Sequence, residues 1–384
     1  MSGAICISDL HLHNYSLFVK PWKFGCNTRL RDQLEVLKAV FITANERNSP
    51  IIFLGDLFND WSSIHTNLHS TVVKALFNYC DLYETHLYIL PGNHDETEKG
   101  KTDMLTLYGL SGHPLIHLIT EPRVININDI SCGFIPYTDD VAYFMREAKE
   151  FERRKVPVLL SHIDIIGATS SIEGYHAKFG IDPSILSPMF KQVILGHYHK
   201  MQTILGNIHY VGSLTQLWPM DERQPRGYAT LKKSGVCNEA TYSVRQHPIV
   251  TGPRFETIHI NSLDGLYNGD FLNSQLINTR SKTFLAKYNT IKCPRNLMEE
   301  VGKILASKAP ELNYVLKPYD FPQNMNVSPF INNQDPFEDK NDHDVSSYLD
   351  RVNQNFFAPN NLINFKYNPA TLQKYYKYYI TETI

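Results

Sequence analysis

The residues of this sequence that could most readily do chemistry are aspartates, histidines and one asparagine that follow short apolar runs. In the clearest case, Asn93, His94 and Asp95 follow the apolar residues 87–90 and a Pro-Gly turn. Such a pattern is typical of a buried strand that ends in a turn. Three adjacent side chains of these types could bind a metal ion, transfer a proton or accept a strong hydrogen bond. A polar surface turn remains the alternative while this short motif is considered alone.

Six more residues of the same kinds also follow predicted strands. They are Asp9, His11, Asp56, His162, His197 and His199. A lone histidine is more often a hydrogen-bonded core residue than a metal ligand, but seven donors at strand ends, Asn93 included, are not independent accidents. Carboxylate, amide-oxygen and imidazole donors suit divalent ions such as manganese, iron or zinc. No cysteine belongs to these motifs, which argues against a structural zinc site.

Seven ligands are too many for one metal site that must keep a position for water. They suit two ions about 3.5–4 Å apart, with the carboxylate of Asp56 bridging them. Two dications that share a hydroxide would hold a strong nucleophile and neutralise the charge that develops on a phosphorus centre. We predict that the first ion is completed by Asp9, His11 and His199, and the second by Asn93, His162 and His197.

His94 stands between a predicted ligand and a carboxylate. A protonated imidazole at this position could donate to the leaving oxygen, and Asp95 could orient or polarise that ring. An eighth metal ligand is the alternative for His94, and it is less favoured because adjacent side chains rarely face the same ion. We therefore predict catalytic roles for His94 and Asp95.

The elements that must position these residues alternate between strand and helix. Apolar runs predict strands at residues 4–8, 51–54 and 87–90, and helical spacing of apolar residues predicts helices at 29–46 and around 72–77. This alternation indicates an α/β fold with helices flanking a sheet. Because parallel strands end at the same edge of their sheet, Asp9, Asp56 and Asn93 are expected to converge.

The second half of the chain predicts further strands and a change of organisation. Short strands are expected at residues 124–127, 132–135, 156–160, 193–195, 208–211, 228–231 and 241–244, with a helix at 144–154. After a Pro/Gly break near 250–253, strands at 255–260, 283–291 and 312–316, a helix at 297–307 and a possible one at 272–276 indicate a small α+β domain. Residues rich in Pro, Asn and acidic side chains then suggest a linker, followed by two short apolar-faced helices expected to bind a partner. We predict domains at residues 1–250, 251–319 and 320–384.

Composition limits the class of protein. The chain has 384 residues, of which 42% are hydrophobic and 20% charged, so two or three packed domains are expected. A net charge of −2 does not by itself call for a nucleic-acid partner. The six cysteines form no C-x-x-C pair, which favours free thiols in a reducing compartment. No apolar run approaches the ~20 residues of a membrane span, and the first residues do not resemble a signal peptide, so a cytoplasmic protein without membrane association is expected.

Taken together and in order, these motifs resemble those of the calcineurin-like metallophosphoesterases over roughly residues 1–244. The resemblance rests on Asp9 with His11, on Gly55-Asp56, on residues 92–95, on His162, and on His197 with His199 after Gly196. It implies a β-sandwich flanked by helices, with a binuclear metal site at the sheet edge. The α/β expectation is refined accordingly, with a small α+β capping domain and a C-terminal helical tail.

Residues 8–12, 55–58, 210–213 and 225–227 are similar to SbcD-type DNA-repair nuclease subunits, particularly phage-type ones. This resemblance implies manganese-dependent hydrolysis of DNA phosphodiesters, exonucleolytic from 3′ ends and endonucleolytic on single strands. It also implies a capping domain that contributes to DNA binding, terminal helices that dock on the coiled coil of an SbcC-type ATPase, and a homodimer. For a viral chain the compartment would be the host-cell cytoplasm.

Two positions depart from the pattern of those relatives. Asn59 stands where some of them carry a histidine that handles the phosphate, and His13 replaces a residue that is often small. His13 is either a surface imidazole or an extra phosphate contact. Basic residues that could flank a DNA-binding cleft, or be ordinary solvated surface, are Lys20, Lys23, Arg29, Arg31, Lys99 and Lys101.

Two other functions compete with the nuclease. One is a phosphodiesterase or phosphatase for a small nucleotide or a phosphoprotein, which would not require a capping domain and terminal helices. The other is a catalytically inactive scaffold with this fold, against which the complete ligand set and His94 argue.

Overall fold

The computed structural model describes residues 3–60, 63–96, 105–172, 174–235, 239–249, 252–267, 287–310 and 312–319. The chain divides into two compact units. The first takes Met1–Thr257 and Asn278–Asn289, and the second takes Ile258–Ile277 and Thr290–Ile384. The predicted helix at 272–276, the linker, the C-terminal helical tail, Lys99 and Lys101 lie outside the described residues.

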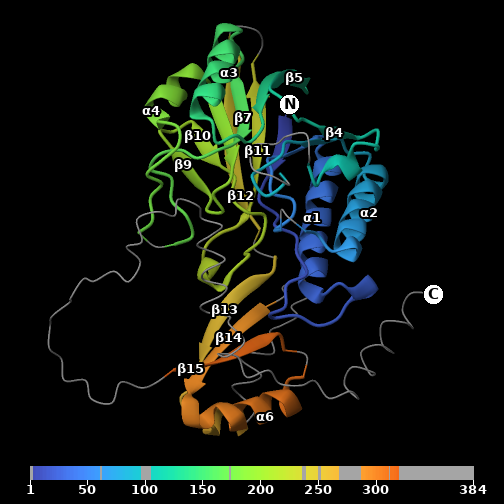
Figure 1. Ribbon diagram of the computed structural model, residues 1–384, viewed down its shortest axis with the longest axis vertical. Coiled ribbons are helices and arrows are strands. Elements are labelled where there is room, and N and C mark those ends of the chain that lie inside the picture. The colour runs from blue at the N-terminus through green and yellow to red at the C-terminus, as the bar shows by residue number, and fades with distance from the viewer. Residues whose placement is uncertain are drawn as a thin grey trace, which may run out of the picture. The chain divides into compact units, whose positions relative to one another are not determined.

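The first sheet of the larger unit has six strands in the order β12-β11-β1-β2-β3-β4. Its strands β4, β11 and β12 are labelled in Figure 1. Its parallel strands are β1 (Gly3–Ile7), β2 (Ile51–Phe53), β3 (Leu87–Ile89) and β4 (Ile116–Leu118). The strands β11 (Gly227–Ser234) and β12 (Thr241–Pro248) pair antiparallel beside β1. The crossovers contain α1 (Thr28–Glu46), capped by the Asn27 side chain, and α2 (Thr66–Leu82).

The second sheet also has six strands, in the order β5-β6-β7-β8-β10-β9. In sequence they are β5 (Arg123–Ile127), β6 (Ile130–Ile135), β7 (Val158–His162), β8 (Gln192–Gly196), β9 (Gln202–Ile204) and β10 (Ile208–Tyr210). The helices α3 (Val141–Arg153) and α4 (Pro183–Leu186) lie in the connections from β6 to β7 and from β7 to β8. Short 3₁₀ turns stand at Lys23–Gly25, Tyr108–Leu110, Ser187–Met189, Pro219–Asp221 and Arg295–Leu297.

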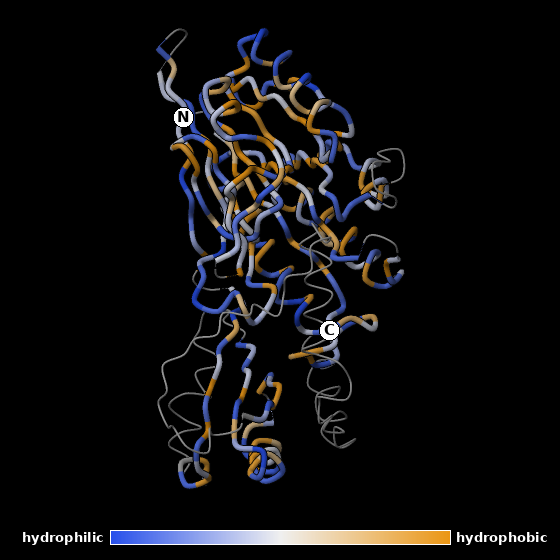
Figure 2. Tube along the Cα trace, turned by 60° about the vertical axis from the view of Figure 1, so that its left-hand side comes forward, coloured by the Kyte–Doolittle hydropathy of each residue, from blue (hydrophilic) through white to orange (hydrophobic). Residues whose placement is uncertain are grey.

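Alternation along the strands explains why the two sheets stack. Ala4 and Cys6 of β1 belong to the apolar cluster between the sheets, which Leu160 and Ile194 enter from the second sheet. The intervening residues of β1 point to the other face and pack with apolar residues of α1 and α2. A strand buried on both faces reads as a continuous apolar run. Figure 2 shows many hydrophobic residues in the interior of the larger unit. The predicted fold class, two sheets flanked by helices, is therefore confirmed for the described residues.

The second unit has a core of its own. The three-stranded sheet β13-β14-β15 is formed by Arg254–His259, Lys287–Pro294 and Tyr314–Tyr319, of which residues 258–259, 290–294 and all of β15 belong to this unit. The helices of this unit are α5 (Asp264–Tyr267) and α6 (Met298–Lys308). Ile291 of β14 and Val301 of α6 are fully buried in one apolar cluster. The unit is thus α+β in its described part.

Five cysteines are buried free thiols, namely Cys6, Cys26, Cys80, Cys132 and Cys293. This agrees with the expectation for them, and Cys237 lies outside the described residues. Among the described helices, none combines the length and the apolar character needed to cross a bilayer.

Candidate metal centre

All seven predicted ligands lie together, and each stands at the end of a strand or in the loop that follows it. Asp9 and Asp56 follow β1 and β2, and Asn93 follows β3. From the other sheet, His162 closes β7, and His197 and His199 follow β8. Because β1, β2 and β3 are parallel, their loops leave the same edge of the first sheet.

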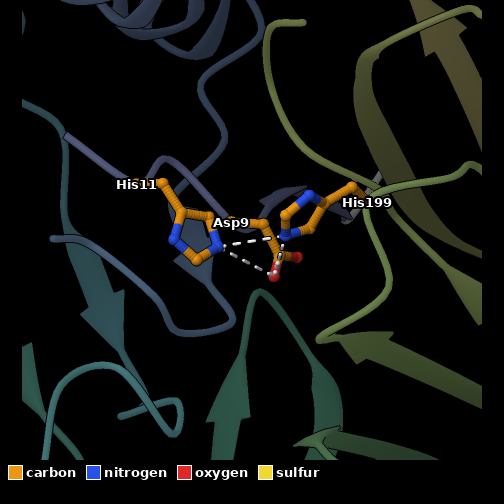
Figure 3. Close-up of side chains that lie close together, drawn as sticks. All are labelled: Asp9, His11 and His199. Atoms are coloured by element: carbon orange, nitrogen blue, oxygen red, sulfur yellow. Dashed lines mark hydrogen bonds and ion pairs between the residues drawn. The ribbon is translucent and has the colours of Figure 1, made fainter. Parts of the chain in front are cut away.

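The first group of donors contains Asp9, His11 and His199, whose side chains point toward one another (Figure 3). Nε2 of His11 lies 3.0 Å from Nε2 of His199. Oδ1 of Asp9 lies 4.0 Å from the His11 nitrogen and 3.9 Å from the His199 nitrogen. We call this group the Asp9 half of the site.

The second group contains Asn93, His162 and His197. Oδ1 of Asn93 lies 3.0 Å from Nε2 of His162 and 3.0 Å from Nδ1 of His197. The two imidazole nitrogens are 3.2 Å apart. We call this group the Asn93 half of the site.

Asp56 stands between the two halves. Its Oδ2 lies 3.4 Å from Nε2 of His11 and 3.5 Å from Nε2 of His162. Its Oδ1 accepts a hydrogen bond of 2.9 Å from the backbone N–H of His94. A single carboxylate oxygen therefore faces one imidazole of each group, which is the arrangement that a bridging ligand requires.

The donor set fits metal ions. His162 donates from Nδ1 to the carbonyl of Leu54 at 2.6 Å, so its Nε2 carries a lone pair. That lone pair faces the oxygen of Asn93 and another imidazole nitrogen at 3.0 and 3.2 Å. Acceptors so close repel one another unless a cation or a proton lies among them. Donors bound at ~2.1 Å to one ion at right angles would lie about 3 Å apart.

Electrostatics place three imidazoles and the bridging carboxylate in the states that bind metal, but raise the pKa of Asp9 and of His197. Burial lowers the pKa of His162 and of His199 to about 4, and that of His11 well below its usual value. Burial opposes ionisation of Asp56, but His162, His94 and His11 hold its pKa below the usual range. Burial and the charge of Asp56 raise the pKa of Asp9 to about 7. Neutral imidazoles around a central carboxylate are the form that ligates a metal ion.

Four of the ligands have left-handed backbone conformations. The φ angles are 51° at Asp9, 43° at His11, 63° at Asp56 and 103° at His197. Such conformations cost of order 1–3 kcal/mol each and persist where surrounding contacts impose them. Here the backbone N–H of His11 donates to the carbonyl of Asp56 at 3.0 Å, and the N–H of His197 donates to Asp9 at 3.2 Å. The ligands thus hold one another's main chain.

A glycine is required where the loops of β2 and β3 meet. Gly92 packs so closely that a Cβ there would overlap Oδ1 of Asp56 and lie 2.7 Å from Cε1 of His162. The Pro-Gly turn therefore allows the backbone to approach the bridging carboxylate directly.

His94 lies at the edge of the cluster. Its ring stands edge-on to the ring of His11, with the centroids 4.7 Å apart. Nδ1 of His94 donates to the carbonyl of Asn59 at 2.6 Å, which leaves Nε2 to hold or release a proton. A carboxylate oxygen of Asp56, a nitrogen of His11 and a nitrogen of His94 also lie close enough to hold one ion, so an eighth ligand stays the alternative.

Asp95 differs from its predicted role beside His94. Its buried carboxylate accepts backbone N–H groups of Asp56 at 2.8 Å, Leu57 at 3.0 Å and Gly92 at 2.9 Å. It therefore joins the loops after β2 and β3, because the turn folds its side chain back toward β2. The contact that orients the His94 ring comes from the carbonyl of Asn59 instead. Position 59 thus serves the site through its main chain.

Two contributors to the site were not predicted from the sequence. Asp164 accepts a hydrogen bond from Nε2 of His197 at 3.1 Å, and Tyr15 donates its hydroxyl to the carbonyl of His11 at 2.9 Å. Burial opposes protonation of His197, yet Asp164 raises its pKa to about 9. The only signal for Asp164 was its place two residues after His162, on the same side of the extended chain.

Two of the basic candidates are engaged in other contacts. Arg29 is buried, stacks its guanidinium 3.7 Å over the ring of Tyr15 and donates to the carbonyl of Leu217. Arg29 therefore lies neither on an exposed DNA-binding rim nor on solvated surface, the two interpretations left open for it. Arg31 pairs with Asp32 at 2.7 Å. His13 is partly exposed and lies 3.1 Å from Asp60, which leaves both of its interpretations open.

Comparison with known sequences agrees with this site. The calcineurin-like phosphoesterase family matches residues 4–201, which is more than half of the chain. The chain belongs to the calcineurin-like phosphoesterases, a family of metal-dependent hydrolases. No curated protein matches its sequence.

Solved structures show distant likenesses. A putative 5′-nucleotidase from Staphylococcus aureus in complex with α-ketoglutarate has 15% identity and a TM-score of 0.39, over 64% of this chain and 52% of the other. This chain thus spans about half the length of that protein. A dimetal phosphatase from Danio rerio has 9% identity and a TM-score of 0.38, over 60% and 92%. A Thermotoga maritima protein has 13% identity and a TM-score of 0.25, over 64% and 100%.

Proposed function

We propose that this chain is a manganese-dependent DNA nuclease, a 3′–5′ exonuclease and single-strand endonuclease that works with an SbcC-type coiled-coil ATPase. The observation that carries the phosphoesterase part is Oδ2 of Asp56, which lies 3.4 and 3.5 Å from imidazoles of the two halves. The DNA substrate, the choice of manganese and the partner rest on the sequence motifs similar to SbcD-type subunits.

The residues of the site are proposed to have separate roles in metal binding and in positioning. Asp9, His11 and His199 would hold one ion, Asn93, His162 and His197 the other, and Asp56 would bridge them. When bound, two divalent ions supply an activated water at neutral pH and neutralise charge on the phosphoryl oxygens. Asp95 fixes the loops of Asp56 and Gly92.

His94 is suited to move the proton. Its Nδ1 is held by the carbonyl of Asn59, and its backbone N–H donates to Asp56. The ring is therefore anchored at one nitrogen and retains the other for the leaving oxygen. A positioned acid of this kind contributes about 10²–10⁴ in rate.

The decisive experiment is a manganese-dependent digestion of 3′-end-labelled and 5′-end-labelled DNA, single- and double-stranded, with and without the ATPase. Mononucleotides released from 3′ ends are the expected products. Parallel assays use a generic phosphodiester, a phosphomonoester and a nucleoside monophosphate. Hydrolysis of the small substrates without any DNA cleavage would favour the small-substrate phosphoesterase. No bound manganese and no hydrolysis of any substrate would leave only the scaffold.

The partner is tested separately. Residues 320–384 lie outside the described part of the chain and are proposed to carry the ATPase-binding helices. A chain truncated after Asp344 should no longer co-purify with the ATPase, while its basal nuclease activity stays at the full-length value. A complex that survives this truncation would show that the tail is not the binding segment.

A further inference from the structure

One contact of the Asn93 half involves a carboxylate outside the seven ligands. Oδ1 of Asp164 lies 3.1 Å from Nε2 of His197 and accepts the hydroxyl of Tyr198 at 2.7 Å. Because an ionised carboxylate can only accept, Nε2 of His197 carries the hydrogen. When the ring is neutral, as a metal ligand must be, its lone pair is then on Nδ1, the atom that lies 3.0 Å from Oδ1 of Asn93.

His197 needs such a restraint more than the other imidazole of this half does. The ring of His162 is fully buried and donates to the carbonyl of Leu54. The side chain of His197 is 13% exposed, stands in a left-handed turn with φ 103°, and has an aromatic neighbour in Tyr137. A ring at the end of such a turn can present either nitrogen to the site. The carboxylate on its far side selects one of them.

Asp164 itself is held by its surroundings. Its carbonyl accepts the N–H of Ile181 at 2.9 Å. The backbone of Gly180 presses against it, since a Cβ on Gly180 would lie 2.7 Å from Cβ of Asp164. Tyr198, its other side-chain partner, is 2% exposed. The main chain and Cβ of Asp164 are thus held by Ile181 and Gly180, and its carboxylate by the hydroxyl of Tyr198.

We propose that Asp164 is a positioning residue that holds His197 with Nδ1 toward Asn93 and His162, and so sets the metal affinity of the Asn93 half. The inference rests on the proposed two-metal site and not on its DNA substrate. Partners that orient a ligating imidazole typically contribute about 10–100-fold in metal affinity.

The test is a titration of the metal-free full chain with Mn²⁺ alone, in which electron paramagnetic resonance measures the free ion. The wild type is expected to bind two ions. Asn93→Ala marks which of the two affinities belongs to its half. Asp164→Ala should weaken that same affinity by about 10–100-fold and leave the other at its wild-type value. Asp164→Asn keeps an acceptor for Nε2 without the charge, so its loss should be intermediate.

Tyr198→Phe is the comparison variant, because it removes the other hydrogen bond of the same carboxylate and keeps the contact of Asp164 with His197. It should weaken the affinity of the Asn93 half much less than Asp164→Ala does and leave the other affinity at its wild-type value. Nitrogen-edited NMR of the histidine rings in the metal-free chain gives a second readout. Hydrogen on Nε2 of His197 is expected in the wild type and in Asp164→Asn, and its loss is expected in Asp164→Ala.

Circular dichroism and thermal melting verify that each variant folds, and Asp164→Asn with Tyr198→Phe carry the test if Asp164→Ala does not. Unchanged Mn²⁺ affinities in a folded Asp164→Ala variant would overturn this inference but not the proposed function. A loss in Tyr198→Phe as large as that in Asp164→Ala would do the same. A wild type that binds no pair of Mn²⁺ ions would overturn the proposed function and this inference with it.

Discussion

The two halves of the metal centre are held in different ways. In the Asn93 half, both imidazoles donate from their far nitrogen, His162 to the carbonyl of Leu54 and His197 to Asp164. In the Asp9 half, Nδ1 of His11 is buried and has no hydrogen-bond partner among the described residues. That residue is held through its main chain instead, by the hydroxyl of Tyr15 and the carbonyl of Asp56.

The difference indicates two routes to one function. In the Asn93 half, hydrogen bonds fix the orientation of both imidazole rings. Apart from the shared Asp56, its oxygen donor is the neutral amide of Asn93. The Asp9 half depends on a second carboxylate and on a strained loop, in which His11 has a φ of 43°. Variants that remove one kind of support should therefore affect one half, and a change at Asp56, whose oxygen faces both, should affect both.

The largest effect is expected from Asp56→Asn. It removes the one anionic oxygen that faces both halves. Loss of a residue that only orients a metal ligand costs up to ~100-fold in affinity, so both Mn²⁺ affinities should fall by more than that, and cleavage should disappear. Metal titration and a phosphodiester assay measure this. Asp60→Asn is the control, as a neighbouring carboxylate that is not a predicted ligand. A loss confined to one affinity would contradict the bridge.

His94→Ser should separate chemistry from metal binding. It keeps the seven ligands, so two Mn²⁺ ions should still bind, while phosphodiester cleavage falls by about 10²–10⁴ through loss of the proton donor. His176→Ser, at an exposed histidine, serves as control and should cleave as the wild type does. Loss of one bound ion in His94→Ser would instead assign His94 as an eighth ligand.

Gly180→Ala should lower the metal affinity of the Asn93 half indirectly, by displacing Asp164. Its φ of 119° disfavours a side chain, and the new Cβ would lie 2.7 Å from Cβ of Asp164. We expect a drop in melting temperature together with a weaker Mn²⁺ affinity in that half. Gly167→Ala is the matched control in the same loop, with a φ of 86° and no atom within 4 Å of its Cβ. It should show only the backbone cost of about 1–2 kcal/mol, measured by denaturant unfolding.

Tyr15→Phe should have the smallest effect, and in the other half. It removes the hydroxyl that binds the carbonyl of His11, a contact worth about 1 kcal/mol. The Mn²⁺ affinity of the Asp9 half should fall by about fivefold, with the Asn93 half unaffected. Equal losses in both halves would show that they are not supported independently.

Much of this site follows from local sequence. Apolar runs at residues 4–8, 51–54 and 87–90 predict parallel strands, and side chains just beyond such strands must meet at one edge of the sheet. The convergence of Asp9, Asp56 and Asn93 could be predicted for that reason. The same local logic recovered the helices at α1, α3 and α6, whose apolar spacing matches one buried face.

Other features depend on contacts between residues far apart in the chain. The carbonyl of Leu54, 108 positions away, decides which nitrogen His162 presents to the site. The carbonyl of Leu217, 188 positions away, accepts a hydrogen bond from the buried Arg29. Asp95 stands next to His94 in sequence but turns to the loop of Asp56. The sequence by itself therefore determined which residues gather at the metal centre. Only the tertiary structure decided which atom each one presents, because ring orientation and hydrogen-bond partners are set by whatever packs on the far side.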